Sequence, residues 1–177
     1  METFELVLLT IATAATPLLI AATGELVVER AGVLNLGVEG MMIMGAVSGF
    51  AAAYMTGSPW LGLIASILVG AAFSLLFAFL TLTLVTNQVA TGLALTLLGL
   101  GLSGMIGEAF VGLPGVKMAV LDIPWLSDLP LVGRLVFGQD PIFYISILLV
   151  FGVSWFLFRT RAGLTLRSVG DSHKSAH

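Results

Sequence analysis

The sequence has 177 residues, of which 58% are hydrophobic and only 10% are charged, and its net charge is −3. Soluble domains carry about 25% charged residues, so this composition indicates a membrane protein and argues against a soluble enzyme. A net negative charge offers no patch that neutralises phosphates, which argues against nucleic-acid binding. The absence of cysteine excludes disulfides, thiolate catalysis and cysteine zinc sites.

The first apolar segment, residues 4–24, is preceded by glutamate instead of a basic region, and no small-residue cleavage site clearly follows it. It therefore predicts a retained transmembrane span and not a removable signal peptide. Pro17 lies inside this segment, and a proline removes one helical hydrogen bond. We expect the hydroxyls of Thr13 and Thr16, or a neighbouring helix, to satisfy the freed backbone group.

The middle of the chain carries no Asp, Glu, Lys, Arg or His from Met41 to Gly107. This stretch is long enough for three bilayer crossings of about 20 residues each. Turn-forming and amide residues interrupt it at 56–59 and at 86–88. The sequence therefore predicts three spans, near 38–55, 60–84 and 89–111.

Charges and prolines return at 112–140, which predicts an outer loop with a short interfacial helix at 125–132. A fifth span is expected at 141–158, before a basic tail. The predicted fold is thus all-α, a polytopic bundle of about five transmembrane helices. Because cytoplasmic loops carry the excess of Lys and Arg, the C-terminus is expected in the cytoplasm and the N-terminus outside, with only Lys117 and Arg134 among the basic residues outside.

Small residues recur every four positions on the second and third predicted spans. Helices in lipid approach closely through such residues, so packing within the bundle is the favoured interpretation, and lining of a solute path is the alternative. The residues are Gly45, Gly49, Ala53 and Gly57, then Gly62, Ser66, Gly70, Ser74 and Ala78, with Gly99, Ser103 and Gly107 on the fourth span.

Polar residues occur at two points close to the predicted spans. Asn35 and Glu39 are four apart and would share one helical face at the start of the second span. A carboxylate near hydrocarbon suggests a functional role, although Glu39 would also suit a helix start because of the helix dipole. Asn87, Gln88 and Thr91 form the second point, where amides suit either a neutral polyhydroxylated or heterocyclic solute or hydrogen bonds between helices. All five are candidates for a substrate pathway.

Catalytic motifs are absent from the sequence. Neither lysine follows a glycine as in a phosphate-binding loop, and no Gly-x-Ser-x-Gly or His-Glu-x-x-His pattern occurs. The chain is therefore not expected to be an enzyme, and no cofactor is expected. His173 and His177 are four apart, but no third ligand of suitable spacing accompanies them, so no metal site is predicted.

Three segments together resemble a known protein family. They are ERAGVLNLGVEGMMIMGA (29–46), TNQVATGLALTLLGLGLSG (86–104) and FRTRAGLTLRSVGDSHKSA (158–176). They are similar to the membrane permease subunits of bacterial ATP-binding cassette (ABC) importers, in the branch of branched-chain amino acid, ribose-type sugar and nucleoside systems. Within this branch the chain most resembles the simple-sugar or nucleoside permeases.

The resemblance implies a permease subunit of the bacterial inner membrane that forms the pathway for a nucleoside or simple sugar. It implies as partners the ABC ATPase subunits, which hydrolyse the ATP, a second permease subunit, and an extracytoplasmic solute-binding protein that docks at 112–140. The segment 159–177 would be a cytoplasmic coupling segment, with a short helix and a turn at Gly170. The residues then expected at or near the ATPase interface are Gly163, Arg167, Ser168, Gly170 and Asp171.

Permeases of this family continue with further membrane helices beyond the coupling segment. The chain therefore looks like the N-terminal part of a larger permease fold. Two other classes stay open: a non-transporting membrane scaffold or fragment, for which the small-residue stripes and the basic tail suffice, and a small passive channel, which the polar residues near the spans would suit.

Overall fold

The computed structural model of the chain describes residues 2–121 and 137–171. All regular elements in this part are helices, and five of them are long and apolar enough to cross a membrane. Many of their large apolar side chains are exposed, as expected for surfaces that face lipid. The structure thus confirms the predicted all-α bundle of a multi-pass membrane protein. The interfacial helix expected at 125–132 lies outside the described residues.

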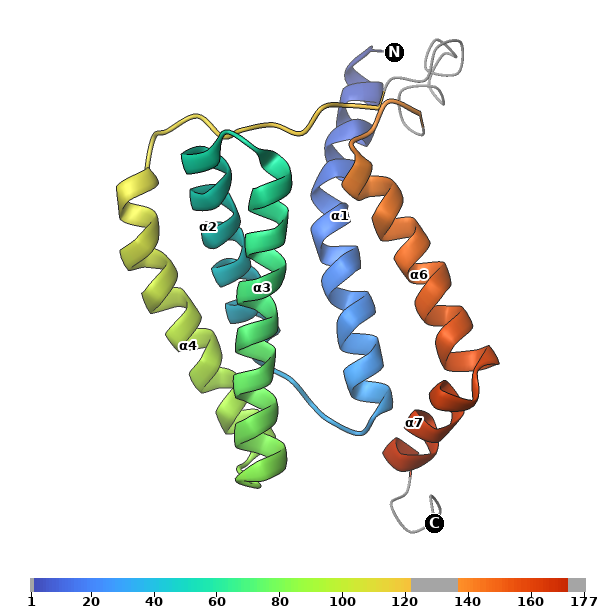
Figure 1. Ribbon diagram of the computed structural model, residues 1–177. Helices are drawn as coiled ribbons and strands as arrows, with labels where there is room; N and C mark the ends of the chain where they lie inside the picture. Colours follow the sequence, from blue (N-terminus) through green and yellow to red (C-terminus); the bar gives the residue numbers. More distant parts are fainter. Residues whose placement is uncertain (1, 122–136, 172–177) are drawn as a thin grey trace. The chain divides into compact units, whose positions relative to one another are not determined.

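The helices belong to two compact units. Figure 1 shows the helices, coloured by their position in the sequence from blue at the N-terminus to red at the C-terminus. The first unit contains the described residues up to Gly32 and from Met118 onward, and the second contains Val33–Lys117. The helices of the first unit are α1 (Glu2–Arg30), α6 (Pro141–Arg159) and α7 (Arg161–Asp171). Those of the second are α2 (Val38–Thr56), α3 (Pro59–Ala78), the π-helix η1 (Phe79–Thr83), α4 (Gln88–Gly107) and the 3-10 helix η2 (Glu108–Phe110).

Helix α1 continues six residues beyond the end expected for the first span, from residue 24 to Arg30. The added turns contain charged residues. Such residues are unfavourable in the hydrocarbon core of a bilayer, but they do not end a helix. Pro17 lies within this helix. A proline at position 17 leaves the Thr13 carbonyl free. The hydroxyls of Thr13 and Thr16 donate instead to the carbonyls of Leu9 and Ala12, which lie four residues and one residue before it. Of the two expected ways to satisfy the freed group, the hydroxyls are thus not used, and a neighbouring helix stays a prediction.

Helix α2 packs against both α3 and α4, and Figure 1 shows the three helices side by side. On one side, a Cβ atom at Gly62 would lie 2.6 Å from the Gly49 carbonyl oxygen, and the Ser66 hydroxyl donates to the Gly45 carbonyl at 2.8 Å. On the other side, a Cβ atom at Gly99 would lie 2.7 Å from the Cα atom of Gly40. Small residues thus pack the helices of this unit together, as the stripes predicted.

The stripe on the third predicted span approaches backbone of another helix only in its first half, although the Ser74 hydroxyl still donates to the sulfur of Met41 at 3.4 Å. A Cβ atom at Gly70 would meet nothing within 4 Å, in contrast to Gly62. Beyond this point the contact is made by larger side chains, because Phe77 is buried in a cluster with Met41 and Leu95. Helices α2 and α3 are therefore held together by backbone approach near the C-terminal half of α2 and by side-chain packing near its start.

Helix α6 begins at Pro141, where the Asp140 carboxylate accepts a hydrogen bond from the backbone N–H of Phe143 at 3.0 Å. This is a standard N-terminal cap, and proline suits the first helical position. Helix α6 packs against α1 and then against α7, which turns back from its end toward the end of α1 (Figure 1). The first unit therefore brings the C-terminal ends of α1 and α6 together with α7.

Candidate functional site

The junction between α6 and α7 is fixed by Thr160. Its hydroxyl donates to the Phe156 carbonyl at 2.6 Å and accepts a hydrogen bond from the Gly163 backbone N–H at 3.0 Å. The residue itself has an extended backbone, with φ −106° and ψ 153°. A single side chain therefore both closes the last turn of α6 and caps the first turn of α7.

Helix α7 packs on the two neighbouring helices through glycines. A Cβ atom at Gly163 would overlap the Phe156 carbonyl oxygen and lie 2.7 Å from the Leu157 Cα atom. A Cβ atom at Gly170 would overlap the Arg30 carbonyl oxygen and lie 2.9 Å from the Gly32 nitrogen. The two glycines are seven residues apart and so lie on one face of α7. This face, near both ends of the helix, is pressed against backbone of α6 and of the end of α1.

Arg167 lies between these glycines on the packed side of α7 and is half-buried. Its guanidinium carbon lies 5.0 Å from the centroid of the Phe158 ring, a distance typical of a cation–π contact. Within the described part of the chain, its buried Nε atom has no hydrogen-bond partner. The side chain thus stacks on the last turn of α6 and helps to hold the angle between the two helices.

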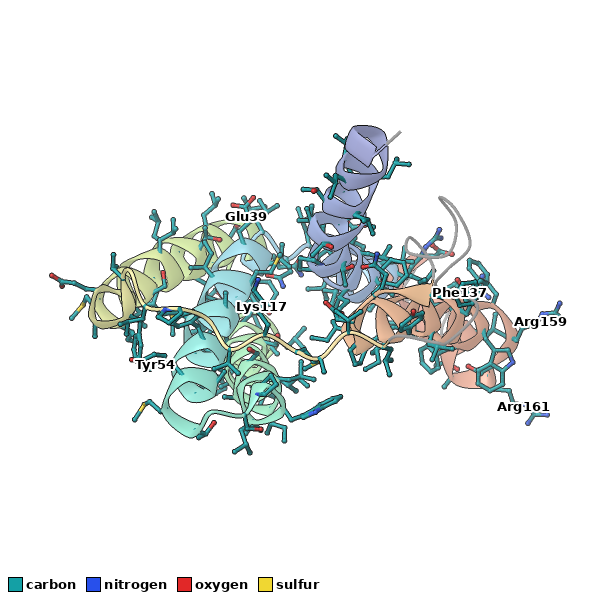
Figure 2. The ribbon with its side chains drawn as sticks, turned by 90° about the horizontal axis from the view of Figure 1, so that it is seen from above. Glu39, Tyr54, Lys117, Phe137, Arg159 and Arg161 are labelled. Carbon is teal, nitrogen blue, oxygen red and sulfur yellow. The ribbon has the colours of Figure 1, made fainter. Side chains whose placement is uncertain are left out.

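The opposite face of α7 is exposed. It carries Arg161, Leu164 and Thr165, and Leu164 is 60% exposed although it is a large apolar residue. Figure 2 shows Arg161, with Arg159 of α6, pointing away from the helices of their unit. Helix α7 therefore packs glycines inward and exposes a leucine among polar residues.

The five residues expected at an ATPase interface are divided between these two faces. Gly163 and Gly170 face α6 and α1, Arg167 stacks on Phe158, Ser168 is half-buried and donates to the Thr165 carbonyl at 2.8 Å, and Asp171 is exposed. The expected turn at Gly170 was wrong, because the helix runs on to Asp171. A glycine fits at this position because the helix approaches α1 closely there, and not because the chain turns.

Asn35 lies in the second unit, in the connection that precedes α2. Its side-chain oxygen accepts from the Gly37 backbone N–H at 2.9 Å, and its amide nitrogen donates to the sulfur of Met41 at 3.7 Å. Asn35 is buried, whereas Glu39 is exposed on the first turn of α2 (Figure 2). The expectation that the two share a helical face was wrong, because α2 begins only at Val38 and Asn35 forms a local turn instead.

The second group of pathway candidates lies at the start of α4. Gln88 accepts a hydrogen bond from the Leu34 backbone N–H at 2.9 Å, and Asn87 caps α4 by accepting from the Ala90 backbone N–H at 3.0 Å. The hydroxyls of Thr91 and Thr86 are 2.9 Å apart. The structure therefore brings Gln88 next to the connection that holds Asn35, and the side-chain oxygens of both amides at the start of α4 are used within the chain.

Several structurally important residues were missed by the sequence reasoning. Gly92 lies so close to the connection before α2 that a Cβ atom there would be 2.8 Å from the Leu36 nitrogen. Gly32 ends α1 with a φ of +81° and contacts Gly170. The spacing of Gly92 and Gly99, seven residues apart on one helical face, was a usable signal. Nothing in the sequence marked Gly32 or Leu164, because their roles depend on helices distant in the chain.

His173 and His177 lie outside the described residues.

The chain is similar to known membrane permeases. Residues 7–177 match the family described as branched-chain amino acid transport system / permease component. The chain is 44% identical over 92% of its length to a putative glucose ABC transporter permease protein of Haloferax volcanii, covering 51% of that protein. It is 36% identical to a guanosine ABC transporter permease protein of Bacillus subtilis and 33% identical to a nucleoside ABC transporter permease protein of Lactococcus lactis, covering 92% and 91% of this chain and 54% of each relative.

The chain thus spans about half the length of the curated relatives it matches. No solved structure matches it.

Proposed function

The chain belongs to the family of branched-chain amino acid transport system permease components, and from this membership we propose that it is the permease part of an ABC importer for a nucleoside or a simple sugar. The relatives named as glucose, guanosine and nucleoside permeases support this choice of solutes. Both solute classes are neutral and rich in hydroxyl groups. ATP hydrolysis is then carried out by a separate ATPase subunit, and this chain supplies part of the membrane pathway.

The observation that carries this proposal is the form of α7. A helix of 11 residues follows a membrane-spanning helix, is clamped on two such helices through its glycines, and leaves a leucine exposed among polar side chains. A partner that covered this face would bury the Leu164 side chain, and full burial of a leucine is worth about 1.5–3 kcal/mol. We assign the outer face of α7, defined by Arg161, Leu164, Thr165 and Ser168, as the surface that docks on the ATPase.

The further partners of the proposed importer are a second permease subunit and an extracytoplasmic solute-binding protein. The excess of basic residues at the end of α6 and in α7 supports a cytoplasmic α7. Five crossings then place the N-terminus and the segment from residue 112 outside, where the solute-binding protein would dock. We also propose that the membrane spans and the cytoplasmic segment have the bounds of the corresponding helices in the structure.

For the solute pathway we propose Glu39. Its side chain is exposed on the first turn of α2, and an ionised carboxylate accepts hydrogen bonds from hydroxyl groups. The other four candidates use their side-chain oxygens in hydrogen bonds within the chain. We assign to Asn35, Asn87, Gln88 and Thr91 the role of holding the start of α4 and the connection before α2.

The test is purification of the full-length permease with its ATPase and solute-binding protein, followed by reconstitution in liposomes. We expect ATP-dependent uptake of a nucleoside or sugar, and we expect Leu164→Glu to reduce the co-purified ATPase about tenfold, because a charge replaces the apolar centre of the interface. Val111→Glu is the control, since Val111 is also highly exposed but lies in the segment assigned to the outside.

The outcomes separate the possible functions. Loss of the ATPase from Leu164→Glu but not from Val111→Glu supports the importer and its docking face. Full retention of the ATPase by Leu164→Glu contradicts the docking face. A wild-type permease that binds no ATPase contradicts the importer, and solute flux without nucleotide would identify a passive channel instead.

A further inference from the structure

The contact between Gly170 and the end of α1 is made by backbone on both sides. A Cβ atom at Gly170 would overlap the Arg30 carbonyl oxygen and would lie 3.0 Å from the Ala31 carbonyl carbon, and one at Gly32 would lie 3.0 Å from the Gly170 Cα atom. Side chains can relieve such approaches by changing rotamer, but backbone atoms cannot. The two segments therefore cannot slide past each other without a shift of a whole helix end.

The other end of α7 is held as firmly. Gly163 is pressed on the backbone of Phe156 and Leu157, and the Thr160 hydroxyl bonds both to α6 and to the first turn of α7. Helix α7 is thus fixed to α6 near its start and to α1 near its end. A rigid helix held at two points cannot turn under a load on its outer face unless at least one of the two supports moves with it.

We infer that Gly32 and Gly170 form a backbone joint through which movement of α7 is passed to α1, so that Gly32 and Gly170 are positioning residues for transport and not docking residues. The inference rests on the proposed function, because it needs an ATPase that moves α7. Gly32 is suited to this role for a second reason: its φ of +81° is a conformation that residues with a side chain rarely adopt. It ends α1 directly before the connection at 33–37, which is hydrogen-bonded to α4 through Leu34 and Gln88.

The experiment compares alanine substitutions in the full-length permease reconstituted with its ATPase and solute-binding protein. Gly170→Ala and Gly32→Ala should each retain the ATPase at the wild-type level but lower the uptake of solute per ATP hydrolysed about tenfold, because the added methyl group forces the joint apart. Gly152→Ala on α6 and Gly24→Ala on α1 are matched controls, since a Cβ atom at either position meets nothing within 4 Å. Both controls should keep the wild-type ratio.

Each other result overturns the inference. Loss of the ATPase from Gly170→Ala, with retention by the controls, would make Gly170 part of the docking surface and would leave the proposed importer intact. An unchanged ratio of uptake to ATP hydrolysis in both variants would show that the joint transmits nothing. Failure of the wild-type complex to bind an ATPase is the separate result that removes the proposed function itself.

A second measurement does not depend on the folding of the glycine variants. These 177 residues contain no cysteine, so in a permease with any other cysteine replaced, spin labels can be placed at Leu26→Cys on α1 and Ala162→Cys on α7, both of which are exposed. In the assembled complex we expect the distance between the labels to stay the same with and without bound ATP, because the joint moves as one body. A change of this distance on ATP binding would overturn the inference.

Discussion

At the scale of single residues, the five candidates for the solute pathway divide into four whose side-chain oxygens are bonded within the chain and Glu39, which is exposed. The oxygens of Asn35, Asn87 and Gln88 each accept a backbone N–H, and unmade hydrogen bonds of this kind are costly in a membrane. Glu39 lies exposed on the first turn of α2. A polar side chain is therefore not by itself evidence for a pathway residue, because most of these side chains hold irregular backbone in place.

This division gives a prediction for Glu39 and Asn87. Glu39→Gln should lower the rate of solute uptake about tenfold, since a hydrogen bond to a charged acceptor is replaced by a weaker one, and should leave thermal stability unchanged. Asn87→Ala should lower the free energy of unfolding by about 1 kcal/mol through loss of the α4 cap. Uptake assays and thermal unfolding in detergent measure the two effects, and unaltered uptake by Glu39→Gln would contradict the pathway assignment.

At the scale of helices, α2 is the centre of its unit because it carries small residues on two sides. Gly49 approaches α3, and Gly40 approaches α4 so closely that a Cβ atom at Gly99 would lie 2.6 Å from the Gly40 carbonyl oxygen. In lipid such contacts replace the hydrophobic effect as the source of helix association. The close crossing of α2 and α4 is thus expected to be sensitive to a single methyl group.

The corresponding prediction compares two glycines of α4. Gly99→Ala should destabilise the helix packing by about 1–3 kcal/mol, the usual cost of overpacking. Gly101→Ala should be neutral or slightly stabilising, because a Cβ atom there meets nothing within 4 Å and alanine favours the helix. Unfolding of the purified protein by denaturing detergent distinguishes the two variants, and equal stability would argue against the close crossing.

At the scale of the whole molecule, the distribution of basic residues and the five spans make a prediction about topology. Leu164→Cys on α7 should react with a membrane-impermeant thiol reagent only from the cytoplasmic side, and Lys117→Cys only from the outside. Both side chains are exposed, and the chain has no other cysteine. Labelling of intact cells and of inverted vesicles reads out the orientation. If both positions were labelled from the same side, the number of crossings between them would not be odd, and the proposed orientation would be contradicted.

Comparison of sequence and structure shows where composition is sufficient. The ends of α2 and α6 agree with the spans expected at 38–55 and 141–158 to within one residue, because turn residues and charges bound the apolar runs there. Helix α1 runs six residues beyond the end expected for the first span, since hydropathy detects the part that crosses a bilayer and not the helix that continues beyond it.

For the candidate site residues, the sequence predicted roles but not contacts. The sequence marked Gly163 and Gly170 as interface residues, but their faces are closed by α6 and by the end of α1. It marked Asn35 as a helical partner of Glu39, whereas Asn35 folds into a turn before the helix. Gly170 meets the end of α1, which is distant in the sequence, whereas Gly163 and Asn35 contact residues within seven positions across a break between helical segments.

The sequence by itself determined that this is an all-helical membrane protein with five spans and which family it resembles, because the energy of apolar residues in lipid depends on composition and length. Only the tertiary structure decided which face of α7 is free, that Gly32 meets Gly170, and which amides are used within the chain. These features depend on distances between segments far apart in sequence, such as Gly32 and Gly170 or Leu34 and Gln88. Such distances depend on the packing of two helices, which is determined by residues of both segments and not by either segment alone.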